Sequence, residues 1–308
     1  MASSDGRQNA GSFKSIENGF ETLQEVEAAI RQAGLEACEL IVGVDFTKSN
    51  TWTGKNSFDG ASCSLRNRII QECWPAGRNL HDVTGPENPY MKAFRLIANM
   101  LKPYDDDRKI PCYGFGDITT GRNTVFSFFP NDEPAQDLEQ LVTRYKQIVP
   151  SVLMSGPTTF APLIRQAMRV VDQSGMKYHV LVILADGQIT MQCLDDTTQA
   201  IVDASEFPMS IVMIGVGDGP WDEMKHFDDK VPQRNWDNFQ FIEFNEVINN
   251  PAMANSEDIQ QNEFALLALM ELPKQYEQAS RLTGEARSGR VRSILEGIPD
   301  RVVIDPPH

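Results

Sequence analysis

The sequence predicts an α/β fold: a doubly wound, mostly parallel sheet with one antiparallel edge strand and helices on both faces. Apolar runs of strand length, such as 40–44 and 178–185, contain no alternating polar residues, which is typical of strands buried on both faces. These runs alternate along the chain with amphipathic helical patterns. Two of the runs end in Asp45 and Asp186, at the strand ends where such sheets bind ligands.

The elements follow from periodicity and from turn residues. Strand patterns lie at 38–45, 110–115, 124–129, 178–186, 208–216 and 239–244, and the third of these is predicted to be the antiparallel edge strand. Helical patterns lie at 22–35, 88–101, 135–149, 159–172, 194–205 and 264–276, the last interrupted at Pro273. The segment 50–89 is long enough to be functional or to hold small structure, including a short helix at 65–70.

One domain accounts for most of the chain. Residues 1–17 are polar and contain Gly and Ser, which predicts a disordered lead-in. Residues 18–281 carry the strand and helix patterns, with no internal repeat and no second core. Beyond Arg281 the periodicity fades, so 282–308 is predicted to be a flexible tail.

Composition narrows the class of protein. The chain has 308 residues, of which 41% are hydrophobic, enough for one large domain or two small ones. Its net charge of −15 argues against bulk attraction to nucleic acid or to anionic lipid. No apolar run has the length of a membrane span, and the N-terminus lacks a secretory core and a Met-Gly start, so no intrinsic membrane anchor is predicted. Five scattered cysteines favour reduced thiols in an intracellular protein, cytoplasmic or nuclear.

Oxygen-bearing side chains gather where the strands end. Asp45, Thr47 and Ser49 stand at alternate positions after the first predicted strand. Asp186 follows a second strand, and Thr158 lies in the turn that opens the helical pattern at 159–172. Carboxylate and hydroxyl oxygens are hard donors that suit Mg²⁺, Mn²⁺ or Ca²⁺ better than zinc. The set predicts a divalent-metal site.

At these five residues the chain resembles the von Willebrand factor A fold and its metal-ion-dependent adhesion site. Further stretches are similar to one branch of that family, the copines, and the resemblance covers roughly residues 20 to 280. The stretches are 113–117, 155–158, 215–222, 227–229 and 237–241.

The resemblance implies a role for each donor. Thr47, in place of the commoner Ser, and Ser49 would bind the cation directly, while Asp45 and Asp186 would bind directly or through water. Thr158 would alternate between the two modes, and an open position on the ion would accept an Asp or Glu carboxylate from a protein partner. Asp117, which ends a neighbouring strand, would either support these ligands from behind or cap a turn.

Two kinds of domain that accompany this one in related proteins cannot be identified in the sequence. Copines place tandem calcium- and phospholipid-binding domains before this domain, and a group of plant ubiquitin ligases places a RING finger after it. A RING needs a dense Cys/His array, whereas the last cysteine of this chain is Cys193.

Three functions remain open at the level of sequence. The first is an intracellular adapter that binds a protein partner through the metal. The second is a protein related to ubiquitin ligases, without autonomous activity. The third is metal-assisted hydrolysis, for which no general base is visible. The chain has no phosphate-loop Gly-Lys-Ser/Thr and no Gly-x-Ser-x-Gly elbow, so a binding module is favoured over an enzyme.

Overall fold

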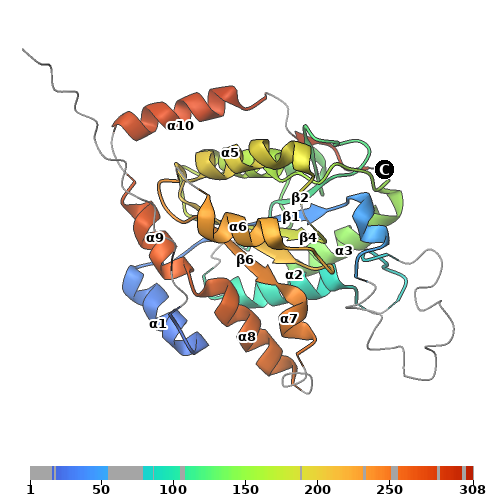
Figure 1. Cartoon of the computed structure of the whole chain (residues 1–308), viewed down its shortest axis with the longest axis horizontal. Helices are drawn as coiled ribbons and strands as arrows, with labels where there is room; N and C mark the ends of the chain where they lie inside the picture. Colours follow the sequence, from blue (N-terminus) through green and yellow to red (C-terminus); the bar gives the residue numbers. More distant parts are fainter. Residues whose placement is uncertain are drawn as a thin grey trace, which may run out of the picture.

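A seven-stranded sheet organises the structure, which is a computed structural model (Figure 1). The structure describes residues 16, 19–54, 79–85, 87–104, 108–187, 189–231, 234–250, 256–282, 285–299 and 303–307. Across the sheet the strand order is β6-β5-β4-β1-β2-β3-β7. The strands are β1 (Glu39–Asp45), β2 (Cys112–Phe115), β3 (Val125–Ser127), β4 (His179–Ala185), β5 (Met209–Gly215), β6 (Phe239–Glu243) and β7 (Val303–Ile304).

The central strands are buried on both faces because their side chains are apolar at every position. In β1, Leu40 and Val42 belong to one hydrophobic core, while Ile41 between them belongs to the other. Such alternation follows from the two-residue period of a strand. Parallel pairing places Val42 opposite Val182 of β4, and Val182 opposite Val212 of β5. The continuous apolar runs thus form the middle of a sheet covered on both sides.

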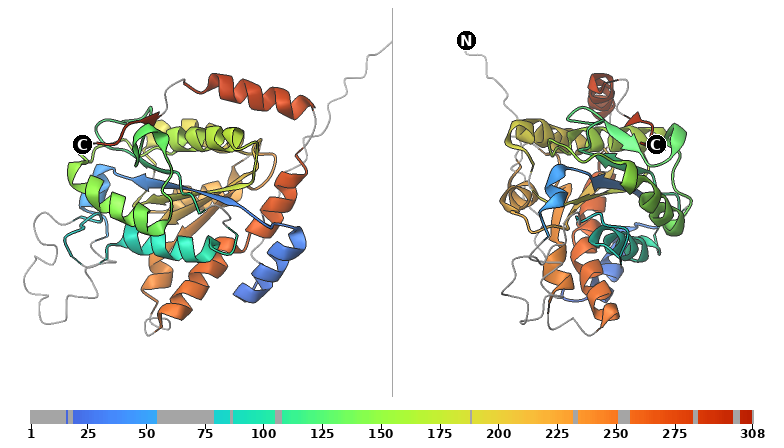
Figure 2. Two further views of the ribbon diagram at one scale, coloured as in Figure 1. Left: turned by 180° about the vertical axis from the view of Figure 1, so that it is seen from behind. Right: turned by 90° about the vertical axis from the view of Figure 1, so that its right-hand side faces the viewer.

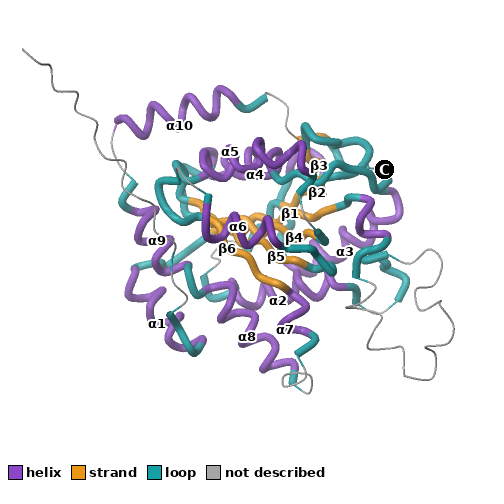
Figure 3. The backbone as a smooth tube through the Cα atoms, viewed as in Figure 1, coloured by secondary structure: helices purple, strands orange, loops and turns teal. Residues whose placement is uncertain are grey.

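Helices cover both faces of the sheet, as Figure 2 and Figure 3 show. On one face lie α1 (Leu23–Ala33), α2 (Pro89–Leu101), α3 (Leu138–Ile148), α7 (Phe244–Ile248), α8 (Glu257–Leu269) and α9 (Leu272–Ser280). On the other lie α4 (Ala161–Gln173), α5 (Leu194–Ala204), α6 (Asp222–Lys230) and α10 (Glu285–Gly297). Short 3₁₀ turns are η1 (Lys48–Thr51), η2 (Pro130–Asp132), η3 (Val149–Ser151) and η4 (Met191–Cys193). None of the helices within the described ranges has the length and apolar composition to cross a membrane.

The predicted fold class is confirmed, with one change at the edge of the sheet. β3 pairs antiparallel with β2, as expected. It is not the outermost strand, because β7 pairs with its free side in parallel, Val125 opposite Val303 and Phe126 opposite Ile304. A two-residue strand far along the chain gives no periodic signal, so the sequence could not reveal this pairing.

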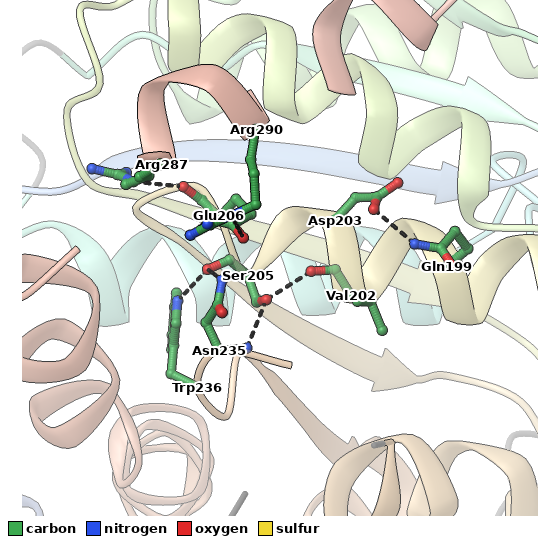
Figure 4. Close-up of polar contacts among 9 residues, drawn as sticks. All are labelled: Gln199, Val202, Asp203, Ser205, Glu206, Asn235, Trp236, Arg287 and Arg290. Atoms are coloured by element: carbon green, nitrogen blue, oxygen red, sulfur yellow. Dashed lines mark hydrogen bonds and ion pairs between the residues drawn. The ribbon is translucent and has the colours of Figure 1, made fainter. Parts of the chain in front are cut away.

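The segment expected to be a flexible tail contains α10 and β7. Val291 and Ile298 of this segment are buried in the core that α4 and α5 also line. Arg290 forms an ion pair with Glu206, just past α5 (Figure 4). Arg169 of α4 donates to the carbonyl oxygens of Ile298 and Pro299. Val291, Ile294, Leu295 and Ile298 recur at helical spacing, a signal that the arginines and Gly289 around them weaken.

Several expected features fall where the structure gives no description. The lead-in predicted over 1–17 lies outside the described residues apart from Ile16, whose amide donates to the Asp237 carboxylate at 3.0 Å. The short helix predicted at 65–70 also lies outside them. The structure adds α6 and α7, which were not predicted, and starts α8 at Glu257, earlier than the apolar pattern indicated.

The strand order fixes where a ligand would bind. The chain adds β2 and β3 on one side of β1 and then crosses to add β4, β5 and β6 on the other side. The direction therefore reverses between β1 and β4. In open α/β sheets, ligands bind beyond the carboxyl ends of the strands at such a switch point.

Candidate metal centre

Two carboxylates meet at the switch point. Asp45 is the last residue of β1, and Asp186 directly follows β4, its neighbour in the sheet. Both residues are 0% exposed. The two predicted strand ends are thus neighbours in space although 141 positions separate them in the sequence (186 minus 45).

An amide and two hydroxyls from the loop after β1 connect the two carboxylates. The main-chain amide of Thr47 donates to Asp45 Oδ1 at 2.7 Å, and Thr47 Oγ1 lies 2.8 Å from Ser49 Oγ. Ser49 Oγ in turn donates to Asp186 Oδ1 at 2.8 Å. Four of the five predicted donors therefore form one connected group.

Thr158 lies in a neighbouring segment, but its hydroxyl does not join that group among the described residues. Its amide donates to Thr190 Oγ1 at 3.1 Å, and its carbonyl oxygen accepts from the Thr190 amide at 3.0 Å. The turn that leads to Thr158 is held at the site, because the Ser155 carbonyl oxygen accepts from the Lys48 amide at 2.7 Å.

Asp117 caps its own turn. Its Oδ2 accepts from the hydroxyl of Thr119 at 2.6 Å, and its Oδ1 accepts from the hydroxyl of Thr120 at 2.6 Å. The amides of the same two threonines donate to the same oxygens at 3.2 and 3.0 Å. This arrangement corresponds to the turn-capping alternative, in which a short acidic side chain satisfies the backbone of its own loop.

The electrostatics of the pair are unfavourable without a cation. Burial first, and then repulsion from Asp186, raise the pKa of Asp45 well above its ordinary value. Burial likewise raises the pKa of Asp186. Asp45 Oδ2 is buried without a hydrogen-bond partner, and within the described ranges no basic side chain forms an ion pair with either carboxylate. A buried oxygen without a partner beside a second carboxylate is the kind of group that a bound cation would satisfy.

The donor set fits a hard cation better than zinc. In the described part of the chain, no three His, Cys, Asp or Glu side chains are grouped so as to hold a metal. The group at β1 and β4 instead combines two carboxylates with neutral hydroxyls. Cys38, Cys112 and Cys193 are buried in the two hydrophobic cores and lie apart from this group. Oxygen donors of this kind suit Mg²⁺, Mn²⁺ or Ca²⁺.

Thr53 is a member of the site that the sequence did not predict. Its hydroxyl donates to Asp186 Oδ2 and lies 3.1 Å from the Ser49 carbonyl oxygen. Asp186 therefore has a hydroxyl partner on each carboxylate oxygen, Ser49 on one and Thr53 on the other. The sequence offered little indication that Thr53 belongs to the site, because Thr53 follows η1, outside the alternating pattern of Asp45, Thr47 and Ser49.

His81 holds the main chain of Asp45 from behind. Its Nε2 lies 2.8 Å from the Asp45 carbonyl oxygen, and its Nδ1 lies 2.7 Å from the hydroxyl of Tyr145. Burial lowers the pKa of His81 to about 3, so the ring is neutral. Because a carbonyl only accepts, Nε2 carries the proton and Tyr145 donates to Nδ1. The ring stacks between Phe46 and Tyr90, with centroids 4.5 and 4.1 Å away.

Two glycines let the loops come together. A Cβ at Gly116 would lie 2.3 Å from Thr47 Cγ2, and the residue has a φ of 82°. A Cβ at Gly217 would lie 2.1 Å from the carbonyl oxygen of Asp186. Larger residues at either position would push the loop after β2 or β5 away from the donors.

Comparison with known proteins places the chain in a family. The family model described as Copine matches residues 79–287, a range that includes Asp117, Thr158 and Asp186. Copine family protein 1 from Caenorhabditis elegans is 38% identical over 256 residues, which cover 83% of this chain and 21% of that protein. Among solved structures, a von Willebrand factor type A protein from Catenulispora acidiphila aligns with a TM-score of 0.42 and 14% identity, covering 76% of this chain and 43% of that one.

Plant proteins match a larger share of the chain. E3 ubiquitin-protein ligase RGLG5 from Arabidopsis thaliana is 42% identical over 308 residues, which cover 96% of this chain and 64% of that protein. E3 ubiquitin-protein ligase RGLG3 from the same organism is 45% identical over 273 residues, covering 85% of this chain and 68% of that protein. The chain thus spans about two thirds of the length of these relatives. With more than half of its residues matched by the family model, the chain belongs to the copine family.

Proposed function

We propose that this chain is a protein-binding module whose interaction depends on a divalent cation, Mg²⁺ or else Mn²⁺ or Ca²⁺. Asp45, Thr47, Ser49 and Asp186 would hold the ion, and Thr158 would join them when its hydroxyl turns toward the site. The observation that carries the proposal is the buried pair of carboxylates with an unpartnered oxygen on Asp45.

The donor set leaves room for a partner. Mg²⁺ takes six oxygens and usually keeps several waters. Hydroxyl oxygens are neutral, so Asp45 and Asp186 are the anionic donors within the group. A carboxylate from a protein partner would replace water at an open position and complete the coordination. A cytoplasmic or nuclear location would fit such an adapter.

Titration calorimetry with Mg²⁺ and with Mn²⁺ tests the metal site. The wild type is expected to bind, whereas Asp45→Asn and Asp186→Asn are expected to give no binding heat because each removes one of the two anionic donors. Asp172→Asn, which alters an exposed carboxylate in the last turn of α4, is the matched control and should bind like the wild type. Equal binding by wild type and both site variants would overturn the proposal.

Thermal unfolding separates loss of metal from loss of fold. Without metal, Asp45→Asn should be at least as stable as the wild type, since it removes a buried charge that repels Asp186. Addition of Mg²⁺ should raise the Tm of the wild type and leave that of the variant unchanged, because a ligand that binds the folded state stabilises it. If Asp45→Asn unfolds without metal under conditions in which the wild type stays folded, Asp45 has a structural role instead.

A role in ubiquitination is a second candidate, favoured by the similarity to the two plant ligases over 96% and 85% of this chain. The chain would then act as the part that binds a partner or a substrate. No dense Cys/His array of the kind that forms a RING occurs in the sequence. An in vitro ubiquitination assay on the purified chain is therefore expected to give no product. The same assay with a ligase added tests whether the chain changes the activity of that ligase.

A further inference from the structure

Exposed apolar side chains lie on loops that adjoin the candidate metal centre. Within the described ranges, five large hydrophobic side chains are at least half exposed: Trp52 (51%), Ile118 (63%), Leu153 (64%), Met191 (72%) and Ile259 (50%). Ile259 lies in α8, and the other four lie in turns and loops near the carboxyl ends of the strands. Trp52, Ile118, Leu153 and Met191 are called the apolar rim below.

Trp52 is joined to the metal-site loop itself. It follows η1, and its amide donates to the carbonyl oxygen of Ser49 at 2.9 Å. The next residue is Thr53, whose hydroxyl contacts Asp186. Trp52 is thus exposed on the same short turn that supplies two hydroxyls to the site.

Ile118 and Leu153 form a second part of the rim. The Ile118 amide donates to the Leu153 carbonyl oxygen at 2.9 Å, so these two exposed residues are neighbours across two loops. Two residues after Leu153, the Ser155 carbonyl oxygen accepts from the Lys48 amide at 2.7 Å. These two hydrogen bonds place Ile118 and Leu153 next to the loop that carries Thr47 and Ser49.

Met191 belongs to the rim through the turn after β4. It starts η4, directly after Thr190, whose hydroxyl accepts from the Thr158 amide at 3.1 Å. Arg122 lies alongside, with its guanidinium 3.7 Å from the sulfur of Cys193 at the end of η4. All four rim residues therefore stand on loops that are hydrogen-bonded to one another or to predicted metal donors.

Exposed cations accompany the apolar rim. Lys48 is exposed between Thr47 and Ser49, and Arg122 is exposed beside η4. The chain as a whole carries a net charge of −15, so an anionic membrane surface would be repelled by most of the molecule. A protein segment with a single carboxylate matches the local cations without meeting that repulsion.

The composition of the rim is that of a protein interface. Aromatic residues and methionine are enriched at interface cores, and exposed apolar groups that cluster on one face mark binding sites. We propose that the partner of this site is a protein segment in which one Asp or Glu is flanked on both sides by large apolar side chains. The acid would reach the cation, and the flanking side chains would cover the apolar rim. This inference rests on the proposed metal-dependent function.

Selection from a peptide library tests the partner. Displayed peptides with one fixed Asp and random flanks are bound to the full chain in Mg²⁺ and eluted with EDTA. The flanks of the retained peptides are expected to be enriched in Leu, Ile, Phe, Trp and Met. A retained peptide, synthesised with its apolar flanks replaced by Ser, should bind at least about tenfold more weakly, since burial of one large apolar side chain contributes more than that factor.

Matched variants of the chain assign the effect to the rim. The double variant Leu153→Ser with Met191→Ser should bind the retained peptide at least about tenfold more weakly. Its affinity for Mg²⁺, measured by titration, should be unchanged. Ile259→Ser, which alters an exposed apolar residue on α8, should change neither the peptide affinity nor the Mg²⁺ affinity. Because all three side chains are exposed, these substitutions spare the core.

Each remaining outcome decides against the inference. Mg²⁺ binding with unbiased flanks, or with no retained peptide, would overturn the apolar partner and leave the metal-dependent function standing. Absence of Mg²⁺ binding would remove the proposed function, and the inference with it. Sedimentation with phosphatidylserine vesicles that is lost in the double rim variant would replace the protein partner with a membrane.

Discussion

Asp45 joins the sheet to the candidate site through two separate groups. Its carboxylate lies at the site, where Oδ1 accepts from the Thr47 amide and Oδ2 is unpartnered. Its carbonyl oxygen points back and accepts from His81 and, at 3.3 Å, from Asn50. The fold thus holds the main chain of Asp45, while its unpartnered Oδ2 is the atom that would meet the proposed cation.

Thr53 gives the sharpest test at the scale of one residue. Thr53→Val keeps the shape of the side chain but removes the hydroxyl that contacts Asp186 Oδ2. We expect Mg²⁺ binding to weaken by roughly tenfold, because groups that orient a metal ligand typically contribute that much or more. Titration calorimetry measures the change.

Thr51 provides the control for that substitution. Its hydroxyl donates to the Lys48 carbonyl oxygen at 2.8 Å and makes no contact with Asp186 among the described residues. Thr51→Val should therefore leave Mg²⁺ affinity unchanged. A loss of the same size in both variants would mean that the turn, and not the hydroxyl of Thr53, determines the affinity.

At the scale of elements, α10 contacts a loop that is hydrogen-bonded to the segment before β6. Ser205 precedes Glu206 in this loop, and its carbonyl oxygen accepts from Trp236 Nε1 at 2.8 Å while its hydroxyl accepts from the Asn235 amide at 3.0 Å (Figure 4). Arg287 donates to the Glu206 carbonyl oxygen at 2.9 Å, and Arg290 forms two hydrogen bonds with its carboxylate. These polar contacts tie α10 to the segment that follows α5.

Apolar packing is expected to hold α10 more strongly than its ion pair does. The Arg290 side chain is 54% exposed, so its pair with Glu206 contributes about 1 kcal/mol or less and weakens with salt. Val291 is 8% exposed. Val291→Ala should lower the free energy that holds α10 on the domain by more than this, on the order of 1–2 kcal/mol. Hydrogen exchange of the α10 amides measures both variants, and a larger increase for Arg290→Gln than for Val291→Ala would contradict this ranking.

At the scale of the whole molecule, Glu271 links global stability to pH. The residue is 4% exposed between α8 and α9, and its Oε2 accepts from Gln275 at 3.1 Å. Burial first, with the nearby charges of Asp228 and Asp237, raises its pKa to about 9 from an ordinary 4.5. The folded protein therefore keeps Glu271 protonated at neutral pH.

The sign of the pH effect follows from that raised pKa. The contribution of Glu271 is fully present below pH 4.5 and is lost as pH rises toward 9, at about 1.4 kcal/mol per pH unit at most. Glu271→Gln should thus match the wild type near pH 5 and be more stable than it at pH 8. Urea unfolding at both pH values measures this, with the exposed Glu277→Gln on α9 as the control. A variant that is less stable at pH 8 would contradict the prediction.

Local sequence patterns determined the fold class and the two carboxylates of the site. The apolar runs that end at Asp45 and Asp186 predicted buried strands, because only a strand covered on both faces tolerates an apolar side chain at every position. The oxygen-bearing side chains of Asp45, Thr47 and Ser49, directly after a buried strand, predicted three donors in one loop at the carboxyl end of the sheet.

Only the tertiary structure decided which distant groups meet. The order that puts β1 beside β4, the pairing of β7 with β3, and the contacts of Thr53 and His81 with the two aspartates all join residues far apart in the chain or outside any periodic pattern. Periodicity reports which side of an element is buried and carries no information on its neighbour. The neighbours are chosen by packing of the complete core, so the surroundings of the site and the apolar rim became visible only when the chain was folded.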